Sequence, residues 1–163
     1  MFGATAVGFA EIQLHQEVKM NERPQAPGYL ANLMARLFHE VSGEGLHPLG
    51  IDAEQFPLLI ELWFGGGTSR AGLEASQESD SQRIDRLLAA MQAEGLLEHI
   101  PSDPGQNLVL TDKANEIRDA AITAARRANQ AATAALTDAE LAQLTSLMNR
   151  VIDALKAERT KQP

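Results

Sequence analysis

The sequence has 163 residues, a formal net charge of −8 at pH 7 and no cysteine. Such a length allows one ordinary domain with a hydrophobic core, or a small domain that carries long helices. The lack of cysteine excludes disulfides, thiol catalysis and thiolate metal sites, and it fits a reducing, cytoplasmic location. No apolar run approaches the roughly 20 residues of a membrane-spanning helix, and no basic start marks a signal peptide, so we expect no membrane partner.

The chain begins with a segment that follows neither helical nor strand periodicity, residues 1–27, which we interpret as an N-terminal arm. Such arms more often pack on a partner subunit than carry chemistry, and we assign no function to this one. Residues 28–42 predict a helix, because their apolar side chains form one wide stripe. The sequence Ser-Gly-Glu-Gly at 42–45 predicts the end of this helix.

A second helix is predicted over residues 52–64, where a capping-box pair, Asp52 and Gln55, precedes a strongly apolar run. Three glycines at 65–67 end it. Glycines in a row can cradle a phosphate, but the spacing and the lysine of a phosphate-binding loop are missing. A turn between helices is therefore favoured.

Two further helices are predicted after these glycines. The first is short, residues 69–76, with Leu73 as its apolar anchor. The second begins at a capping-box pair formed by Ser79 and Gln82, and Gly95 has the conformational freedom to close it. Its apolar side chains recur at the spacing of one buried helix face: Ile84, Leu87, Leu88 and Met91.

The opposite face of this second helix carries long polar side chains, Gln82, Arg83 and Arg86, beside alanines. Arginine and glutamine supply the paired donors that read guanine and adenine edges, and alanine lets a helix approach DNA closely. The face therefore suits a major groove. An ordinary solvated helix face explains the same residues equally well, and the order of the surrounding elements must decide between the two.

Two short apolar runs, residues 96–100 and 108–110, flank a turn-rich tip that contains two prolines and a glycine. They predict a small β-hairpin, in which Asp103 can fix the tip through a local hydrogen bond. A helix with a polar face followed directly by a hairpin is the layout of a winged helix.

The charge of this part of the chain argues against easy DNA binding. Between residues 51 and 110 there are ten acidic and three basic residues, which gives a net charge of −7. Phosphate neutralisation supplies most of the affinity for DNA. We therefore expect weak binding, or binding that depends on a dimer with a few well-placed arginines.

Two helices are predicted in the C-terminal part of the chain. Thr111 caps the first, which runs to about residue 135 with a face of small residues that another helix could approach closely. A capping-box pair, Thr137 and Glu140, opens the last helix. Its apolar side chains alternate spacings of three and four, as in a coiled coil: Leu141, Leu144, Met148, Val151 and Leu155. This pattern predicts pairing with a partner chain, although folding back within a monomer would also cover it.

The order of these elements resembles the MarR family of bacterial transcriptional regulators over about residues 29–158. The segments that carry the resemblance are LGIDAEQF at 49–56, IDRLL at 84–88 with EGLL at 94–97, LVLT at 108–111 and LTDAEL at 136–141. Their order and spacing are specific, although no single segment is. Two features depart from the family pattern: the tip at 102–107 has no arginine, and Gln77-Glu78 replaces a Leu-Gly pair.

The resemblance implies a mainly α fold, in which a winged helix-turn-helix domain with a small β-hairpin wing, residues 51–110, is flanked by long helices that form a dimerisation domain, residues 28–50 and 111–163. It also implies a homodimer that reads a palindromic site on double-stranded DNA with the helix that starts near Asp80. Carried over by position, the residues that would face the major groove are Ser81, Gln82, Arg83 and Arg86, while Arg70 would contact phosphate and Gln106 and Asn107 would reach the minor groove.

Regulators of this family often respond to an aromatic ligand. Three residues are candidates for such a pocket, because they combine aromatic rings with a titratable group: Phe38, His39 and Trp63. Ordinary core packing is the favoured explanation of the same three residues.

The sequence therefore predicts a dimeric DNA-binding transcriptional regulator, a repressor, that a small aromatic ligand can release. The alternative is a winged-helix dimer that binds DNA weakly or not at all and acts through a protein or a small molecule. An enzyme is the weakest hypothesis, since the histidines His15, His39, His47 and His99 lack a metal-binding spacing. We expect no cofactor and no metal.

Overall fold

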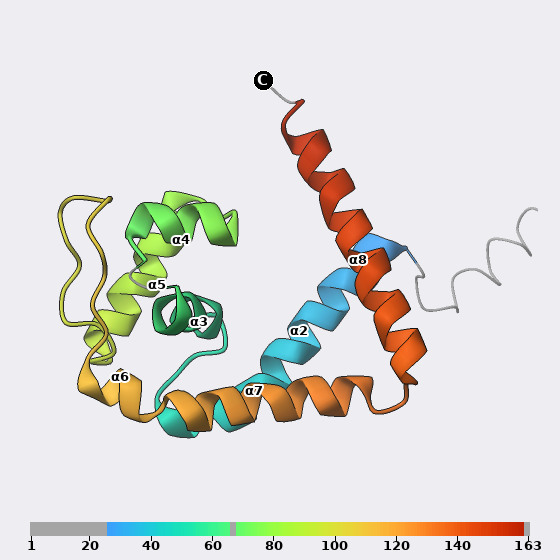
Figure 1. The fold of residues 1–163 in the computed structure, drawn as a ribbon, viewed down its shortest axis with the longest axis horizontal. Helices are drawn as coiled ribbons and strands as arrows, with labels where there is room; N and C mark the ends of the chain where they lie inside the picture. The colour runs from blue at the N-terminus through green and yellow to red at the C-terminus, as the bar shows by residue number, and fades with distance from the viewer. Residues whose placement is uncertain (1–25, 66–67, 162–163) are drawn as a thin grey trace, which may run out of the picture. The chain divides into compact units, whose positions relative to one another are not determined.

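A computed structural model describes residues 26–65 and 68–161 of the chain. The chain divides into two compact units, residues 1–37 and 38–163. The arm predicted for residues 1–27 lies, apart from its last two residues, outside the described part of the chain. The described elements are helical, apart from single backbone bridges, and the ribbon in Figure 1 follows them in order.

Helix α2 (Pro27–Leu46) runs past Ser42, where the sequence predicts its end, so that prediction is wrong. Gly43 and Gly45 lie inside the helix. A Cβ atom on Gly45 would stand 2.8 Å from the Cβ atom of Ala124, so the glycine lets a distant helix come close. The two glycines therefore do not stop the helix, and at least one of them serves a contact that local sequence patterns cannot reveal.

A short 3-10 turn, η1 (His47–Leu49), connects α2 to the rest of the second unit. Gly50 ends it with φ +72°, a backbone conformation that favours glycine. The chain then enters the core at Ile51, which is almost fully buried.

Helix α3 (Phe56–Phe64) begins later than the sequence predicts. One of the two hydrogen bonds of the expected capping box is present, because Oε1 of Gln55 accepts from the backbone N–H of Asp52 at 2.8 Å. The other is not, since Oδ1 of Asp52 accepts from the backbone N–H of Glu54 at 2.8 Å. The Gln55 side chain is buried, and its Nε2 donates to Oε2 of Glu94 at 2.8 Å. Since Glu94 is the C-terminal cap of helix α5 (Ser81–Ala93), this glutamine ties the start of α3 to the end of α5.

Helix α4 (Arg70–Gln77) precedes α5. The side chain of Ser69 caps it, which agrees with the predicted start of this helix. The cap of α5 is Asp80, whose Oδ1 accepts a hydrogen bond from the backbone N–H of Arg83 at 2.8 Å. The predicted capping box at Ser79 is therefore wrong by one residue. Serine and aspartate are both good cap residues, so the residue types at 79 and 80 alone do not decide which of the two caps the helix.

The C-terminal end of α5 confirms the role predicted for Gly95, which has φ +73°. The backbone N–H of Leu96 donates to the carbonyl of Met91 at 2.8 Å, and that of Gly95 donates to the carbonyl of Gln92 at 3.0 Å. These two hydrogen bonds form a Schellman motif. Both Met91 and Leu96 are fully buried, so the motif turns the chain directly into the core.

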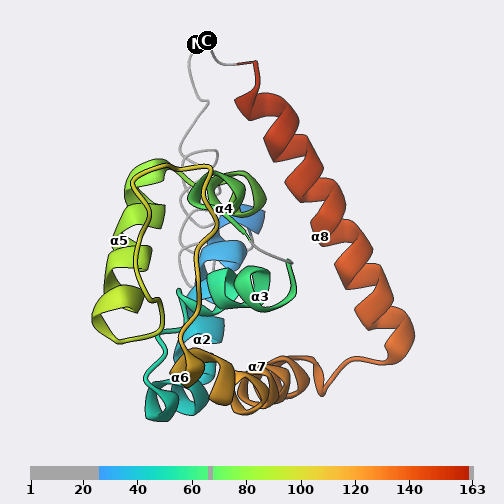
Figure 2. The ribbon, with the colours of Figure 1, turned by 60° about the vertical axis from the view of Figure 1, so that its left-hand side comes forward.

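One hydrophobic cluster joins α3, α4, α5 and the segments that follow α5, and Figures 1 and 2 show these three helices side by side. The predicted apolar face of α5 supplies Ile84, Leu88 and Met91, which are fully buried, and Leu87, which packs at the edge. The predicted anchor Leu73 of α4 is fully buried too. The burial of these side chains holds the three helices together.

The segment after α5 folds back on itself without forming a strand longer than one bridge in the described residues. Leu97 and Leu110 form an antiparallel bridge, and a second bridge joins Asn107 to Ser69 in front of α4. The two extended arms are the olive and amber segments beside α5 in Figures 1 and 2. The predicted β-hairpin wing is therefore not confirmed as a pair of strands.

The single long helix predicted from Thr111 is divided into two, α6 (Asp112–Glu116) and α7 (Arg118–Thr133). The predicted cap is confirmed, because Oγ1 of Thr111 accepts a hydrogen bond from the backbone N–H of Ala114 at 3.2 Å. Ile117 interrupts the helix with φ −83° and ψ −7°. Small buried residues of α7 pack on the core beyond this break.

Helix α8 (Asp138–Arg159) opens with the predicted capping box of Thr137 and Glu140, which is confirmed. The backbone N–H and the Oγ1 of Thr137 each donate to Oε2 of Glu140 at 2.8 Å. No residue of α8 is buried by the described chain. Its five heptad-spaced apolar side chains, which we call the α8 row, are 37 to 67% exposed: Leu141, Leu144, Met148, Val151 and Leu155.

Candidate nucleic-acid interface

The start of α5 presents a group of exposed polar side chains: Ser81, Gln82, Arg83 and Arg86. They occupy the first, second, third and sixth positions of the helix. Residues three and four apart lie on the same side of a helix, so Gln82 and Arg83 share one face with Arg86. The aspartate cap and the buried apolar face fix the direction of this polar face relative to the core.

Arg83 does not extend freely from this face. Its Nη2 lies 3.5 Å from Oε2 of Glu54, which belongs to the turn before α3, and both side chains are about half exposed, 50% and 51%. Such an exposed ion pair contributes at most about 1 kcal/mol. A phosphate or a base edge could therefore replace Glu54 as the partner of Arg83. Arg86, by contrast, has no carboxylate partner within the described part of the chain.

Arg70 is held more firmly than the sequence predicts. Its Nε lies 3.1 Å from Oε1 of Glu74 in the same helix and 3.0 Å from Oδ1 of Asp85 in α5. The guanidinium thus bridges α4 and α5 instead of pointing away from the protein. The spacing of Arg70 and Glu74 is visible in the sequence, but the part played by Asp85 is not.

The tip of the folded-back segment carries Gln106 and Asn107, both exposed. Oδ1 of Asp103 accepts a hydrogen bond from the backbone N–H of Gly105 at 2.8 Å, which is the local bond predicted for this aspartate. In addition, the carbonyl of Pro104 accepts a hydrogen bond from the backbone N–H of Ala71 at 3.0 Å. The tip is therefore attached to the first turn of α4.

The turn between α4 and α5 is linked to the far end of α8 through Glu78, a contact that the sequence did not suggest. Oε1 of Glu78 pairs with Nζ of Lys156, and Oε2 lies 2.9 Å from Nη2 of Arg159. The hydrogen bond from Lys156 holds the pKa of the Glu78 carboxyl below its ordinary value, and the charges of both basic residues act in the same direction. Glu78 is therefore a carboxylate with two cationic partners.

The three residues predicted for a ligand pocket, Phe38, His39 and Trp63, are each half-buried. The ring of Trp63 packs edge-on against that of Phe56, with 6.3 Å between the ring centroids, and both rings lie against the hydrophobic core. The Nε1 of Trp63 is buried and has no hydrogen-bond partner among the described residues. These contacts agree with the packing alternative for Trp63.

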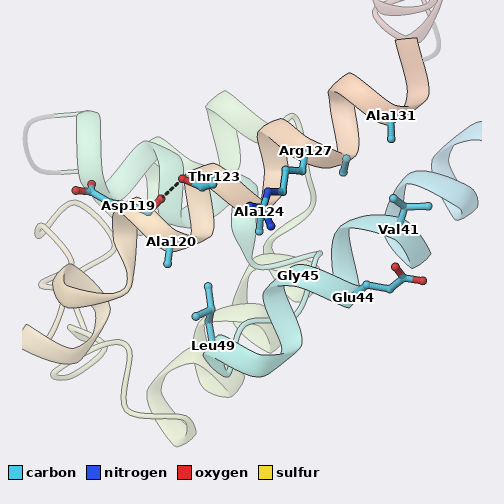
Figure 3. Close-up of a pocket in the computed structure, with 11 residues that line it drawn as sticks. Val41, Glu44, Gly45, Leu49, Asp119, Ala120, Thr123, Ala124, Arg127 and Ala131 are labelled. Carbon is cyan, nitrogen blue, oxygen red and sulfur yellow. Dashed lines mark hydrogen bonds between the residues drawn. The ribbon is translucent and has the colours of Figure 1, made fainter. Parts of the chain in front are cut away.

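An open groove of about 760 Å³ lies between α2 and α7, and Figure 3 shows the side chains that line it. Val41 and Leu49 face it from one side, and Ala124 and Arg127 face it from the other. None of the three aromatic-pocket candidates lines this groove.

The described residues contain no group of three histidine, aspartate or glutamate side chains that could hold a metal ion. Within the same ranges, no helix has both the length and the apolar character needed to cross a membrane.

The chain matches known proteins in fold and not in sequence. No protein-family profile matches the chain, and no curated protein matches it in sequence. Solved structures do match. A MarR-family transcriptional regulator from Rhodococcus sp. RHA1 is 17% identical, with a TM-score of 0.65 over 78% of this chain and 97% of the other.

Two further matches are structures solved with DNA. The MepR–DNA complex of S. aureus is 16% identical, with a TM-score of 0.69 over 80% of this chain and 96% of the other. A mutant of MarR from E. coli in complex with operator DNA is 25% identical, with a TM-score of 0.67 over 76% of this chain and 91% of the other. The mainly helical architecture and these matches agree with the fold expected from the sequence. The chain therefore has the fold of the MarR-family winged-helix transcriptional regulators.

Proposed function

We propose that the chain is a homodimeric DNA-binding transcriptional regulator that acts in the cytoplasm as a repressor. Two copies of α5 would read the two halves of a palindromic site in successive major grooves. The observation that carries this proposal is the exposed start of α5, where Gln82, Arg83 and Arg86 share a face within a MarR-like fold. Side chains of these types have the donor geometry that guanine and adenine edges accept.

The dimer is supported by the α8 row. Its side chains lie 37 to 67% exposed on a 22-residue helix, none of whose residues is buried by the described chain. Monomeric proteins rarely leave a contiguous apolar patch of this kind in water. Heptad spacing fits the row to the same row of a second copy, because knobs of one helix then enter holes of the other.

The contacts with the DNA backbone are proposed from the residues that surround α5. Gln106 and Asn107 are the candidates for the minor groove, since both are exposed at the tip. A phosphate contact by Arg70 would have to compete with Glu74 and Asp85. With a net charge of −7 over residues 51–110, affinity should depend strongly on the few arginines that remain available.

The test is a binding titration with a duplex that the wild-type protein selects from a random-sequence pool. Arg86→Ala should weaken binding about tenfold or more and reduce the salt slope by about one. Arg126→Ala, which removes an exposed charge of α7, is the matched control and should change neither quantity. Failure of the wild-type protein to select any sequence would reject the proposal.

The second candidate function is a winged-helix dimer that has weakened or lost its DNA contact and acts through a protein or a small molecule. The ion pairs of Arg70 and Arg83 with nearby carboxylates favour it, because they neutralise two of the three arginines in this region. The same titration separates the two functions. This candidate requires salt-sensitive binding to be weak or absent at low ionic strength.

We also propose that a small aromatic ligand releases the regulator from DNA, with Phe38, His39 and Trp63 as the residues to test. The unpartnered Nε1 of Trp63 supports this, since a buried donor without an acceptor can gain a hydrogen bond from a ligand. A thermal-shift screen with aromatic acids tests it. Stabilisation that Trp63→Phe abolishes is the expected result, and no stabilisation by any acid would reject a pocket.

A further inference from the structure

Glu78 has an unusual backbone conformation and lies in the turn between α4 and α5. It ends α4 with φ 48° and ψ 36°, and it has the only positive φ of a non-glycine residue in the described chain. Two residues later, Asp80 caps α5. A left-handed conformation is unfavourable for a residue with a Cβ atom, so contacts elsewhere must hold Glu78 in place.

Those contacts come from the last turns of α8. Both carboxylate oxygens of Glu78 are engaged, one by Lys156 and the other by Nη2 of Arg159 at 2.9 Å. The backbone carbonyl of Glu78 also accepts a hydrogen bond from Nη1 of Arg159 at 3.4 Å. Arg159 therefore holds both the side chain and the backbone of the residue that leads into α5.

The surroundings of this contact are partly apolar. An open groove of about 390 Å³ lies between the C-terminal ends of α4 and α8, and Ile152 and Leu155 line it together with Lys156 and Arg159. A single exposed ion pair contributes little, but several charges that share one carboxylate form a network. The lowered pKa of Glu78 agrees with such a network.

We propose that Glu78 is a positioning residue, through which α8 sets the orientation of α5. This contact has a consequence in a dimer: α8, the helix that joins two copies, would also fix the separation of their two α5 helices. That consequence rests on the DNA-binding function proposed above. The contact itself can be tested without DNA.

The first experiment measures distances between α5 and α8 by double electron–electron resonance. Because the chain has no cysteine, spin labels can be placed on Ala89→Cys in α5 and Ala139→Cys in α8. Labelled chains are diluted into unlabelled ones so that only distances within one chain contribute. Glu78→Gln should broaden the distance distribution about twofold, and about 1 M salt should do the same, because exposed ion pairs are screened.

A control variant and a charge-reversal variant make this experiment decisive. Glu116→Gln removes an exposed carboxylate of α6 and is the matched control, so it should leave the distribution unchanged. Glu78→Lys combined with Lys156→Glu and Arg159→Glu reverses every charge of the contact and should narrow the distribution again. If Glu78→Gln weakens folding, Glu78→Asn replaces it, since asparagine tolerates this backbone conformation. An unchanged distribution in a folded Glu78 variant would overturn the proposal.

The second experiment concerns the consequence for DNA. Wild-type protein should bind the duplex selected from a random pool about tenfold more tightly than one with a base pair inserted between its halves, because the insertion rotates one half-site. Glu78→Gln should reduce this ratio to about twofold by allowing both spacings. An unchanged ratio with broadened distances would reject the consequence. A wild-type protein that selects no duplex would reject only the DNA-binding function, and the distance measurement would still decide the contact.

Discussion

At the scale of single residues, Arg70 shows how a basic side chain near a candidate DNA surface can act within the protein. Its guanidinium lies between Glu74 of its own helix and Asp85 of the next, at 3.1 and 3.0 Å. The arginine therefore links α4 to α5, and the phosphate contact predicted for it would have to compete with these two carboxylates.

Arg70→Ala should lower the free energy of unfolding by about 1 kcal/mol, a modest value because the partner side chains are 28% and 50% exposed. Urea unfolding followed by circular dichroism measures it. Arg86→Ala serves as the control, since it removes an exposed arginine that has no carboxylate partner in the described part of the chain, and it should stay within about 0.5 kcal/mol of wild type. Equal losses in both variants would contradict a bridging role for Arg70.

Residue-level predictions from the sequence succeeded where a short segment determines the outcome. Gly95, Thr111 and the pair of Thr137 and Glu140 all take the cap positions predicted for them, because their partners lie within four residues. The positions of Ser81, Gln82, Arg83 and Arg86 as DNA contacts stay predictions. The partners Glu54, Asp85 and Glu78 were missed, since each depends on a contact between separate elements.

At the scale of elements, the crossing of α2 and α7 depends on Gly45. Alanine there would place a Cβ atom 2.8 Å from that of Ala124. The resulting overlap costs about 1–3 kcal/mol, which exceeds the helical preference of about 1 kcal/mol for alanine over glycine.

Gly45→Ala should therefore reduce the free energy of unfolding, by about 1 kcal/mol net. Gly28→Ala is the matched control, because nothing lies within 4 Å of its added Cβ atom, and it should not destabilise the chain. A double-mutant cycle with Ala124→Gly measures the contact directly. Additive effects would contradict the close approach of the two helices.

The first turn of α8 should be sensitive to acid. The hydrogen bond from the backbone N–H of Thr137 to Glu140, followed by that from its hydroxyl, lowers the pKa of the Glu140 carboxyl below its ordinary value of 4.5. A lowered folded-state pKa means that the carboxylate stabilises the folded state above pH 4.5, and that this stabilisation is lost as pH falls through the folded pKa.

The stability difference between wild type and Glu140→Gln should therefore be largest at neutral pH and should shrink below pH 4.5. Urea unfolding at a series of pH values measures this difference. Glu116→Gln, for which no such hydrogen bonds are formed in the described chain, should show no comparable trend. A difference that stays constant into acid would argue against the capping box.

The boundaries of elements were predicted less well than their order. Gly45 approaches Ala124 of α7, and the break at Ile117 falls on a residue that packs against the core, and no local pattern reveals either contact. Helix α3 starts later than predicted, and the bond of Gln55 to Glu94 at the end of α5 could not be foreseen from the local pattern. The buried face of a helix, in contrast, follows from the periodicity of its apolar residues alone, and the face predicted for α5 is the buried one.

At the scale of the whole molecule, the α8 row is an apolar surface that the described chain leaves largely exposed. Leu144→Glu should shift the protein from dimer to monomer and raise the dissociation constant by about tenfold or more, because a buried unpaired charge is costly. Analytical ultracentrifugation over a range of concentrations measures this shift.

Ser146→Glu is the matched control for this substitution, since Ser146 is exposed outside the α8 row. It should leave the dimer intact. If wild-type protein is monomeric at all concentrations tested, the row has another role and the proposed dimer is wrong. The sequence predicted the heptad spacing, but a partner chain is needed to decide what covers it.

The hydrogen bond between Ala71 and Pro104 has a consequence for how the protein can be altered. Surface loops usually tolerate inserted residues, because their backbone atoms bind mainly to water. Here an insertion between Asp103 and Gly105 would remove an acceptor from the opening turn of a neighbouring helix. Lengthening this loop to equip it with new basic side chains would therefore loosen the helix behind it, and charge is better added by exchanging residues at constant length.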